Sequence, residues 1–209
     1  MSQSFDDADV KRIVAVIEGE PSVREALYQV LGFCRQRTTL ANVIEYLDDA
    51  CGSDALQDSF DYLLRLEFSG AISVESMLDG QPLTAEEEAA YREGAFDRGA
   101  EVQEFCILTE AGAAAEASLH PWRRMALLLE AKPEYEDLFK GTLEFCSEPK
   151  SLQEIEHFLE QDDRVATLAQ SKDRVWPAYF IDRLKNAGAI EWREGWVCAD
   201  DQLIEKLAA

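Results

Sequence analysis

Few residues in this chain could carry out catalysis, and the first candidates are two histidines and a set of cysteines. His120 precedes a proline, and His157 lies at an outward-facing position of an expected helix. Cys34 and Cys146 occupy equivalent apolar positions in two similar stretches of the chain, which indicates packing residues rather than nucleophiles. A reactive thiol needs a positively charged and accessible setting, and this acidic chain offers little of it.

Metal and cofactor chemistry has as little support. Glu86, Glu87 and Glu88 are consecutive, so on a helix they point in different directions and form a solvated acidic surface. The five cysteines are an odd number without a C-x-x-C pair, which argues against a zinc ribbon or a disulfide framework. The sequence also lacks a glycine-rich phosphate loop, H-E-x-x-H and G-x-S-x-G. We therefore predict no enzyme activity, no catalytic residue, no metal site and no cofactor.

The chain carries one pattern twice. "LGFCRQRTTLANVIEYLDD" begins at Leu31 and "LEFCSEPKSLQEIEHFLEQ" begins at Leu143, an offset of 143 − 31 = 112. A second pair, "YLLRLEFSGAI" from Tyr62 and "FIDRLKNAGAI" from Phe180, aligns at an offset of 180 − 62 = 118. Matches at apolar positions in two blocks of the same order predict a duplicated structural unit.

Each copy is expected to contain three helices followed by a β-hairpin. Apolar residues recur at three- and four-residue steps through the first two helices of each copy, which is the helical period. Ser22 with Glu25 predicts a capping box at the first helix of the first copy, and Ser151 with Glu154 predicts one at the second helix of the second copy.

Glycines and alternating residues mark the end of each copy. Gly70 and Gly188 are predicted to close the third helices, because glycine tolerates the left-handed backbone found there. Alternation after each glycine predicts strands, and "IEWREGWVC" predicts a hairpin that turns at Glu194-Gly195. The first hairpin holds an insert, "TAEEEAAYRE", predicted to be a helix capped by Thr84 and Glu87.

At "LRLEFSGAIS" and "FCILTEAGAAA" the chain resembles the winged helix-turn-helix superfamily. The resemblance implies a mainly α fold with small β-hairpins (α+β), made of two tandem winged-helix domains joined by a helical connector. The expected first domain, 1–118, has an extra N-terminal helix over 7–18 and an expanded wing. The connector covers 119–133, and the second domain covers 134–209. The apolar side of this extra helix must be buried. The helix therefore either closes the first domain or makes a contact in a homo-oligomer.

The charge of the chain bears on its partners. The sequence holds 42 Asp and Glu against 20 Lys and Arg, a formal net charge of −22. A field of that sign repels nucleic acid and favours a protein partner with a basic surface, although it could also serve solubility alone. The N-terminus lacks the cationic segment of a secretory signal, and no apolar run approaches the roughly 20 residues of a membrane span. We expect a cytoplasmic protein without membrane contact.

The third helices differ in charge, which matters because this helix of the fold commonly enters the DNA major groove. In the first copy the region holds Asp54, Asp58, Asp61 and Glu67 against Arg65. In the second copy the basic residues are Lys172, Arg174, Arg183 and Lys185, with Arg193 in the wing. We expect a non-catalytic, acidic protein-interaction or regulatory module. The alternative is a transcriptional regulator that contacts DNA through these five basic residues of the second domain.

Overall fold

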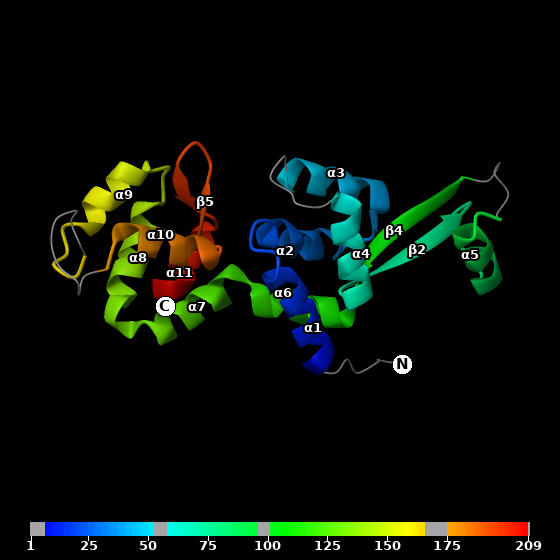
Figure 1. Cartoon of the computed structure of the whole chain (residues 1–209), viewed down its shortest axis with the longest axis horizontal. Coiled ribbons are helices and arrows are strands. Elements are labelled where there is room, and N and C mark those ends of the chain that lie inside the picture. The colour runs from blue at the N-terminus through cyan, green and yellow to red at the C-terminus, as the bar shows by residue number, and fades with distance from the viewer. Residues whose placement is uncertain (1–6, 52–57, 96–100, 166–174, 209) are drawn as a thin grey trace. The chain divides into compact units, whose positions relative to one another are not determined.

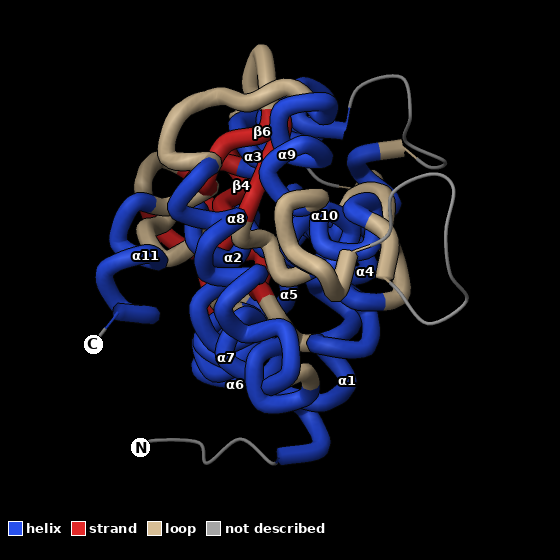
Figure 2. Tube along the Cα trace, turned by 90° about the vertical axis from the view of Figure 1, so that its left-hand side faces the viewer, coloured by secondary structure: helices blue, strands red, loops and turns tan. Residues whose placement is uncertain are grey.

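The structure is a computed structural model (Figure 1), and it describes residues 7–51, 58–95, 101–165 and 175–208. The chain forms two compact units, Met1–Leu119 and His120–Ala209, each with its own apolar core. As predicted, the fold is mainly helical with two small antiparallel sheets (Figure 2). Within the described ranges, no helix combines the length and apolar character that crossing a membrane requires.

The first unit combines helices with a four-stranded sheet of order β1-β4-β2-β3. Its elements are α1 (Asp7–Glu18), α2 (Arg24–Phe33), β1 (Thr38–Thr39), α3 (Leu40–Cys51), α4 (Ser59–Ser69), β2 (Ile72–Leu78), β3 (Gln81–Pro82), α5 (Ala85–Arg92), β4 (Val102–Leu108) and α6 (Glu110–Leu119). The long strands β2 and β4 pair along their whole lengths and extend away from the helices, with α5 beside their far end (Figure 1). The insert of the first hairpin is therefore the helix α5, as its pattern predicts.

The core of the first unit lies among its helices. α3 packs against both α2 and α4, and α1 packs against α4 and α6. Ile13 and Ile17 of α1 are fully buried in this core. Of the two roles expected for the extra N-terminal helix, α1 therefore takes the first and closes the first unit.

The second unit is built around a shorter hairpin. Its elements are α7 (Pro121–Ala131), the 3-10 turn η2 (Pro133–Tyr135), α8 (Glu136–Phe145), α9 (Leu152–Leu159), α10 (Pro177–Asn186), β5 (Ile190–Trp192), β6 (Trp196–Cys198) and α11 (Asp201–Ala208). The helix expected in the connector, α7, packs against α11 and buries Met125 and Leu129 in the second core. It is part of the second unit because its apolar face is covered there.

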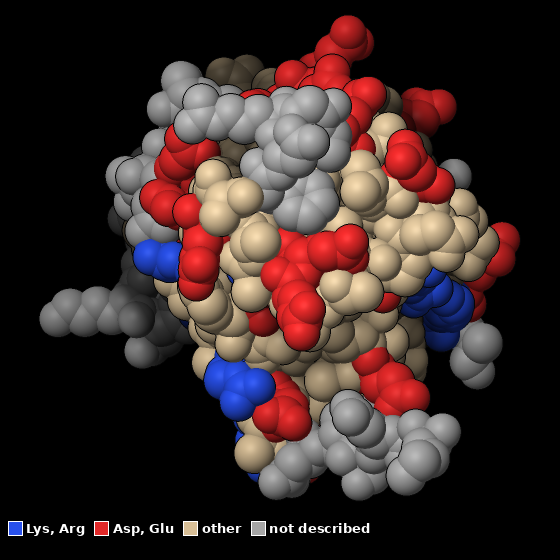
Figure 3. Space-filling view, turned by 90° about the vertical axis from the view of Figure 1, so that its right-hand side faces the viewer, with Lys and Arg blue, Asp and Glu red and all other residues tan. Residues whose placement is uncertain are grey.

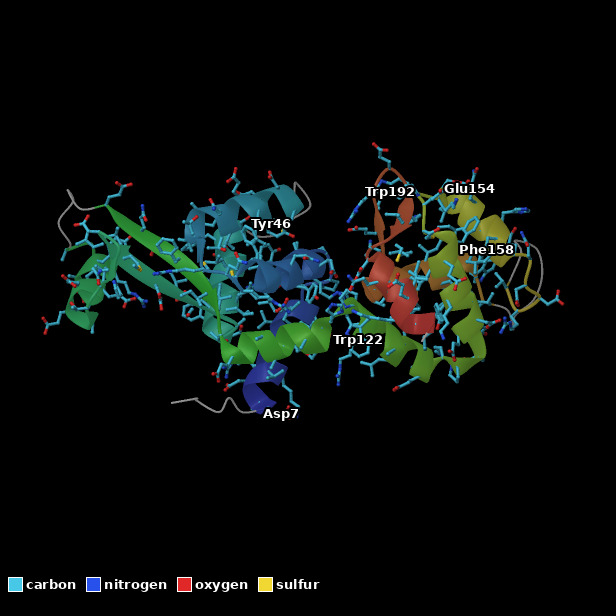
Figure 4. The ribbon with its side chains drawn as sticks, turned by 180° about the vertical axis from the view of Figure 1, so that it is seen from behind. Asp7, Tyr46, Trp122, Glu154, Phe158 and Trp192 are labelled. Atoms are coloured by element: carbon cyan, nitrogen blue, oxygen red, sulfur yellow. The ribbon has the colours of Figure 1, made fainter. Side chains whose placement is uncertain are left out.

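Aligned positions of the two copies have similar surroundings. At the offset of 112, five aligned pairs of apolar residues are buried in both copies: Leu27 and Phe139, Leu31 and Leu143, Cys34 and Cys146, Val43 and Ile155, Leu47 and Leu159. Phe33 stacks on Tyr46 with ring centroids 5.7 Å apart, and Phe145 stacks on Phe158 at 4.7 Å. Figure 4 labels the second ring of each stack. The same aromatic contact thus joins the first two helices of each copy.

Two of the three predicted capping boxes are confirmed, at Thr84 with Glu87 and at Ser151 with Glu154. The one predicted at Ser22 is wrong, because α2 begins at Arg24 and its N-cap residue is Val23, which makes no side-chain cap. A tight turn brings the chain from α1 into α2, and Val23 is buried in the core. Tertiary packing therefore sets the start of this helix.

The glycines predicted to close the third helices do so in the same way. Gly70 has φ 84° and Gly188 has φ 67°, both in the left-handed region. In each copy the N–H after the glycine donates to the carbonyl five residues earlier, at 2.9 Å. This pairing satisfies carbonyls that the end of a helix would leave without a partner. In the second hairpin, the residue with left-handed backbone at the turn is Glu194, with φ 58°.

The "LTEAG" stretch fixes α6 against the end of α4. The Thr109 hydroxyl donates to the carbonyl of Gly70 at 2.6 Å and accepts from the Gly112 N–H at 2.9 Å. A Cβ at Gly112 would lie 2.0 Å from the carbonyl oxygen of Ala71. Glycine is therefore required at position 112 because the backbones touch there.

A Gly112→Ala substitution is expected to lower the free energy of unfolding by about 3 kcal/mol, since backbone must shift to relieve the clash. Gly141 in α8 is the matched control, because a Cβ there would make only an ordinary contact, 3.4 Å from the ring of Phe158. Gly141→Ala should be neutral or stabilise by up to about 1 kcal/mol through helix propensity. Urea unfolding followed by circular dichroism measures both, and equal effects would contradict this account.

Arg164 joins the segment after α9 to the start of α8. Its guanidinium donates to Asp162 at 2.8 Å, to Asp137 at 3.1 Å, and to the carbonyl oxygen of Glu134 at 2.7 Å. These hydrogen bonds lower the pKa of Asp162 to about 2 and also lower the pKa of Asp137. Each lowered pKa means that the folded state favours the ionised carboxylate more than the unfolded chain does.

Stability from this contact is fully present above the ordinary Asp pKa of about 3.9 and is lost as the pH falls toward 2. Arg164→Met should lower the free energy of unfolding at pH 7 by about 1 kcal/mol, because the pair is partly exposed. The variant should also lose less stability than the wild type between about pH 4 and pH 2. Urea unfolding at several pH values tests this, and parallel pH profiles would disagree with it.

Candidate functional site

A groove of about 530 Å³ lies beside α4 in the first unit, and we call it the α4 groove. Its lining residues come from α3, α4, β2, α5 and β4: Leu40, Phe60, Leu63, Leu64, Glu67, Phe68, Val74, Ser76, Arg92 and Glu104. Its volume is in the range of small-molecule and side-chain binding sites.

One wall of the α4 groove is an apolar stripe on α4, made by Phe60, Leu64 and Phe68. Residues four apart lie on one face of a helix, so the three side chains form a row about 12 Å long. Phe68 is 81% exposed and Phe60 is 45% exposed, while Leu64 is half-buried. Exposed apolar patches of this kind commonly mark interaction sites.

The floor of the groove is one face of the sheet. Val74 and Ser76 of β2 point to this face, and Ser76 lies directly opposite Glu104 on β4. Arg92 from the end of α5 also lines the groove and forms an ion pair with Glu88 at 2.8 Å. The insert in the first hairpin therefore contributes to the site.

The groove combines this apolar surface with negative charge. Burial raises the pKa of the half-buried Glu104 carboxyl, the charge of Glu67 raises it further, and Arg92 partly opposes both effects. Acidic side chains also predominate on the end of the first unit seen in Figure 3. A ligand of this groove would gain from an apolar surface and a positive charge.

The second copy lacks the apolar stripe. At the offset of 118, Phe60, Leu64 and Phe68 correspond to Ala178, Asp182 and Asn186, all of which are exposed on α10. The same type of helix therefore folds with a small residue and two polar residues at these positions. Our interpretation of the sequence considered only the charges of the third helices and missed the stripe, although comparing the two aligned blocks would have revealed it.

The basic residues predicted to contact DNA are only partly brought together. Arg183 and Lys185 are exposed on α10, but residues two apart on a helix do not share a face. The Arg183 guanidinium lies 5.2 Å above the ring of Tyr179. Arg193, next to the turn of the hairpin, forms an ion pair with Glu191. Lys172 and Arg174 lie outside the described residues.

The cysteines considered for catalysis lie in the cores, and of the two histidines one caps a helix and the other is exposed. All five cysteines are free and buried, and burial raises the pKa of the Cys146 thiol to about 11, away from reactive thiolates. His120 caps α7 by accepting from the Trp122 N–H at 3.3 Å, and His157 is exposed on α9. In the part of the chain that the structure describes, no three His, Cys, Asp or Glu residues are grouped to hold a metal.

No protein-family model matches the sequence, and neither a curated protein nor a solved structure matches it. The geometry and charge of the α4 groove are therefore the basis for a functional proposal.

Replacing Glu104 with Gln should stabilise the protein at neutral pH. The raised pKa means that the folded state favours the protonated carboxyl, so the wild type gains stability as the pH falls through that pKa. Glu104→Gln removes the charge and should raise the free energy of unfolding at pH 7 by less than about 1 kcal/mol, because solvent screens the partly exposed carboxyl. The gain should vanish below about pH 4, where the carboxyl is protonated in both states.

Glu101→Gln is the control, because Glu101 is exposed beside the same strand and its replacement changes the net charge equally. Thermal unfolding at pH 7 and pH 3.5 measures both variants. A gain for Glu101→Gln as large as that for Glu104→Gln would point to general charge repulsion and contradict a local cause.

Proposed function

We propose that this chain is a non-catalytic protein-interaction module of two winged-helix domains, and that the α4 groove holds a segment of another protein. The order of elements supports the winged-helix part, since in each unit three helices of the repeated pattern, α2 to α4 or α8 to α10, lead into a β-hairpin. The sheet of the first unit also places β4 between β1 and β2. The observation that carries the function is the exposed apolar stripe on α4, whose counterparts on α10 are one small and two polar residues.

The character of α4 favours a protein over DNA as its ligand. A helix that enters the major groove needs polar or basic side chains that reach bases and phosphates. The outer face of α4 instead presents Phe60, Leu64 and Phe68, with Glu67 beside them. In a chain with a net charge of −22, this face would be repelled by a phosphate backbone. The same charge would speed the encounter with a basic protein.

This function can be tested with a photo-reactive amino acid that is incorporated at one residue of the chain while the protein is expressed in cells. Benzoylphenylalanine in place of Phe68 should form discrete covalent adducts with protein, because the side chain would lie in the occupied groove. The same amino acid in place of Asn186, the counterpart on α10, is the control and should give few or none. Adducts from position 186 alone, or equal adducts from both, would argue against the α4 groove as the binding site.

A second candidate is DNA contact through the second unit, favoured by the exposed Arg183 and Lys185 on α10. The position of Glu67 in α4 is held by Lys185 in α10, so the two helices differ in charge at the same place. This function predicts a mobility shift of random duplex at low salt. Arg183→Gln with Lys185→Gln should then reduce the slope of log K against log salt by about 2. Without any shift at low salt, this candidate would be ruled out.

A further inference from the structure

The backbone groups between the two strands beneath the α4 groove are already hydrogen-bonded to each other. β2 and β4, which form its floor, pair with each other from Ile72 opposite Leu108 to Leu78 opposite Val102. The wall, α4, is a helix and satisfies its own backbone groups. Along its floor the groove thus offers a ligand the side chains on one face of the sheet, because the backbone groups between β2 and β4 already pair with each other.

This limits the conformation of a polypeptide in the groove. An extended segment would bring its own N–H and C=O groups onto an apolar surface that cannot pair with them, and burying such groups unpaired is costly. A helix pairs these groups internally and can lay one apolar face against another helix. The straight row of Phe60, Leu64 and Phe68 has the form that an apolar helix face would match.

The charges of the groove limit the sequence of the occupant. Glu67 and Glu104 both line the groove, and the charge of Glu67 acts on the half-buried Glu104 carboxyl. Arg92, which also lines it, is held in the ion pair with Glu88. A cation supplied by the ligand would therefore meet two carboxylates, whereas an acidic ligand would add a third negative charge.

Resting on the function proposed above, we infer that the natural occupant of the α4 groove is an amphipathic helix of a partner protein. Its apolar face packs on Phe60, Leu64 and Phe68, and a Lys or Arg at the edge of that face reaches Glu67 and Glu104. The helix supplies an apolar face that covers the stripe and a positive charge, in addition to Arg92, for the two carboxylates.

Peptide display on the full-length chain tests the inference. A library of random 18-residue peptides is selected on the wild type and counter-selected on Phe68→Asn, which introduces the residue found at the aligned position of α10. The enriched peptides should carry apolar residues at three- and four-residue spacing and more Lys and Arg than Asp and Glu. Asn186→Ala is the control and should select the same peptides as the wild type.

One enriched peptide is then synthesised and studied by anisotropy and circular dichroism. It should gain helicity on binding, and its affinity should fall at least about 10-fold for Glu67→Lys, with recovery when its key Lys or Arg is changed to Glu. A loss of affinity that the charge-reversed peptide does not recover would contradict the proposed contact between the cation and Glu67.

The possible failures are distinguishable. Phe68-dependent peptides that alternate in polarity, or that carry no excess of basic residues, would overturn the helix inference while the proposed function stands. Phe68-dependent self-association of the chain, seen by sedimentation, would overturn it in favour of a second copy as occupant. The proposed function would also be contradicted if no enriched peptide depends on Phe68 and no cross-link forms from position 68.

Discussion

The third helix of each copy, α4 or α10, packs into its core through one face. In α4 that face carries Tyr62, Leu63 and Leu66, and in α10 it carries Phe180, Ile181 and Leu184, all buried. This packing fixes the helix against its neighbours and thereby sets the orientation of the hairpin that follows it. Because the helix packs into the core through that face, the opposite face is free to differ between the copies. It carries an apolar stripe in α4 and small or polar residues in α10.

The α4 groove retains features that do not serve stability. Phe68 exposes a large ring to water, and Glu104 holds a carboxyl whose ionised form is disfavoured by burial and by Glu67. Residues that cost stability and recur at one place are typical of binding sites, where function limits what the fold can optimise. The two features complement each other, since a partner helix with an apolar face and a basic residue would satisfy both.

Much of the fold could be predicted from the sequence because local patterns determine it. Apolar spacing indicated the helices, and two capping boxes and two closing glycines were predicted correctly. The start of α2 was not, because burial of Val23 outweighs the Ser22 signal. The groove could not be predicted either, since it needs the register of β2 on β4 and the position of α5, which bring Glu104 and Arg92 beside α4. No local sequence pattern indicates how residues so far apart in the chain come together.

The most direct test exchanges the stripe for its counterparts in α10, as Phe60→Ala, Leu64→Asp and Phe68→Asn together. If the stripe is a binding surface and not part of the core, cooperative unfolding should persist, with a total loss in unfolding free energy of no more than about 1–2 kcal/mol. Leu66→Ala, on the buried face of the same helix, should alone cost about 2–5 kcal/mol. A triple variant as unstable as Leu66→Ala, or one that no longer unfolds cooperatively in urea, would contradict the account.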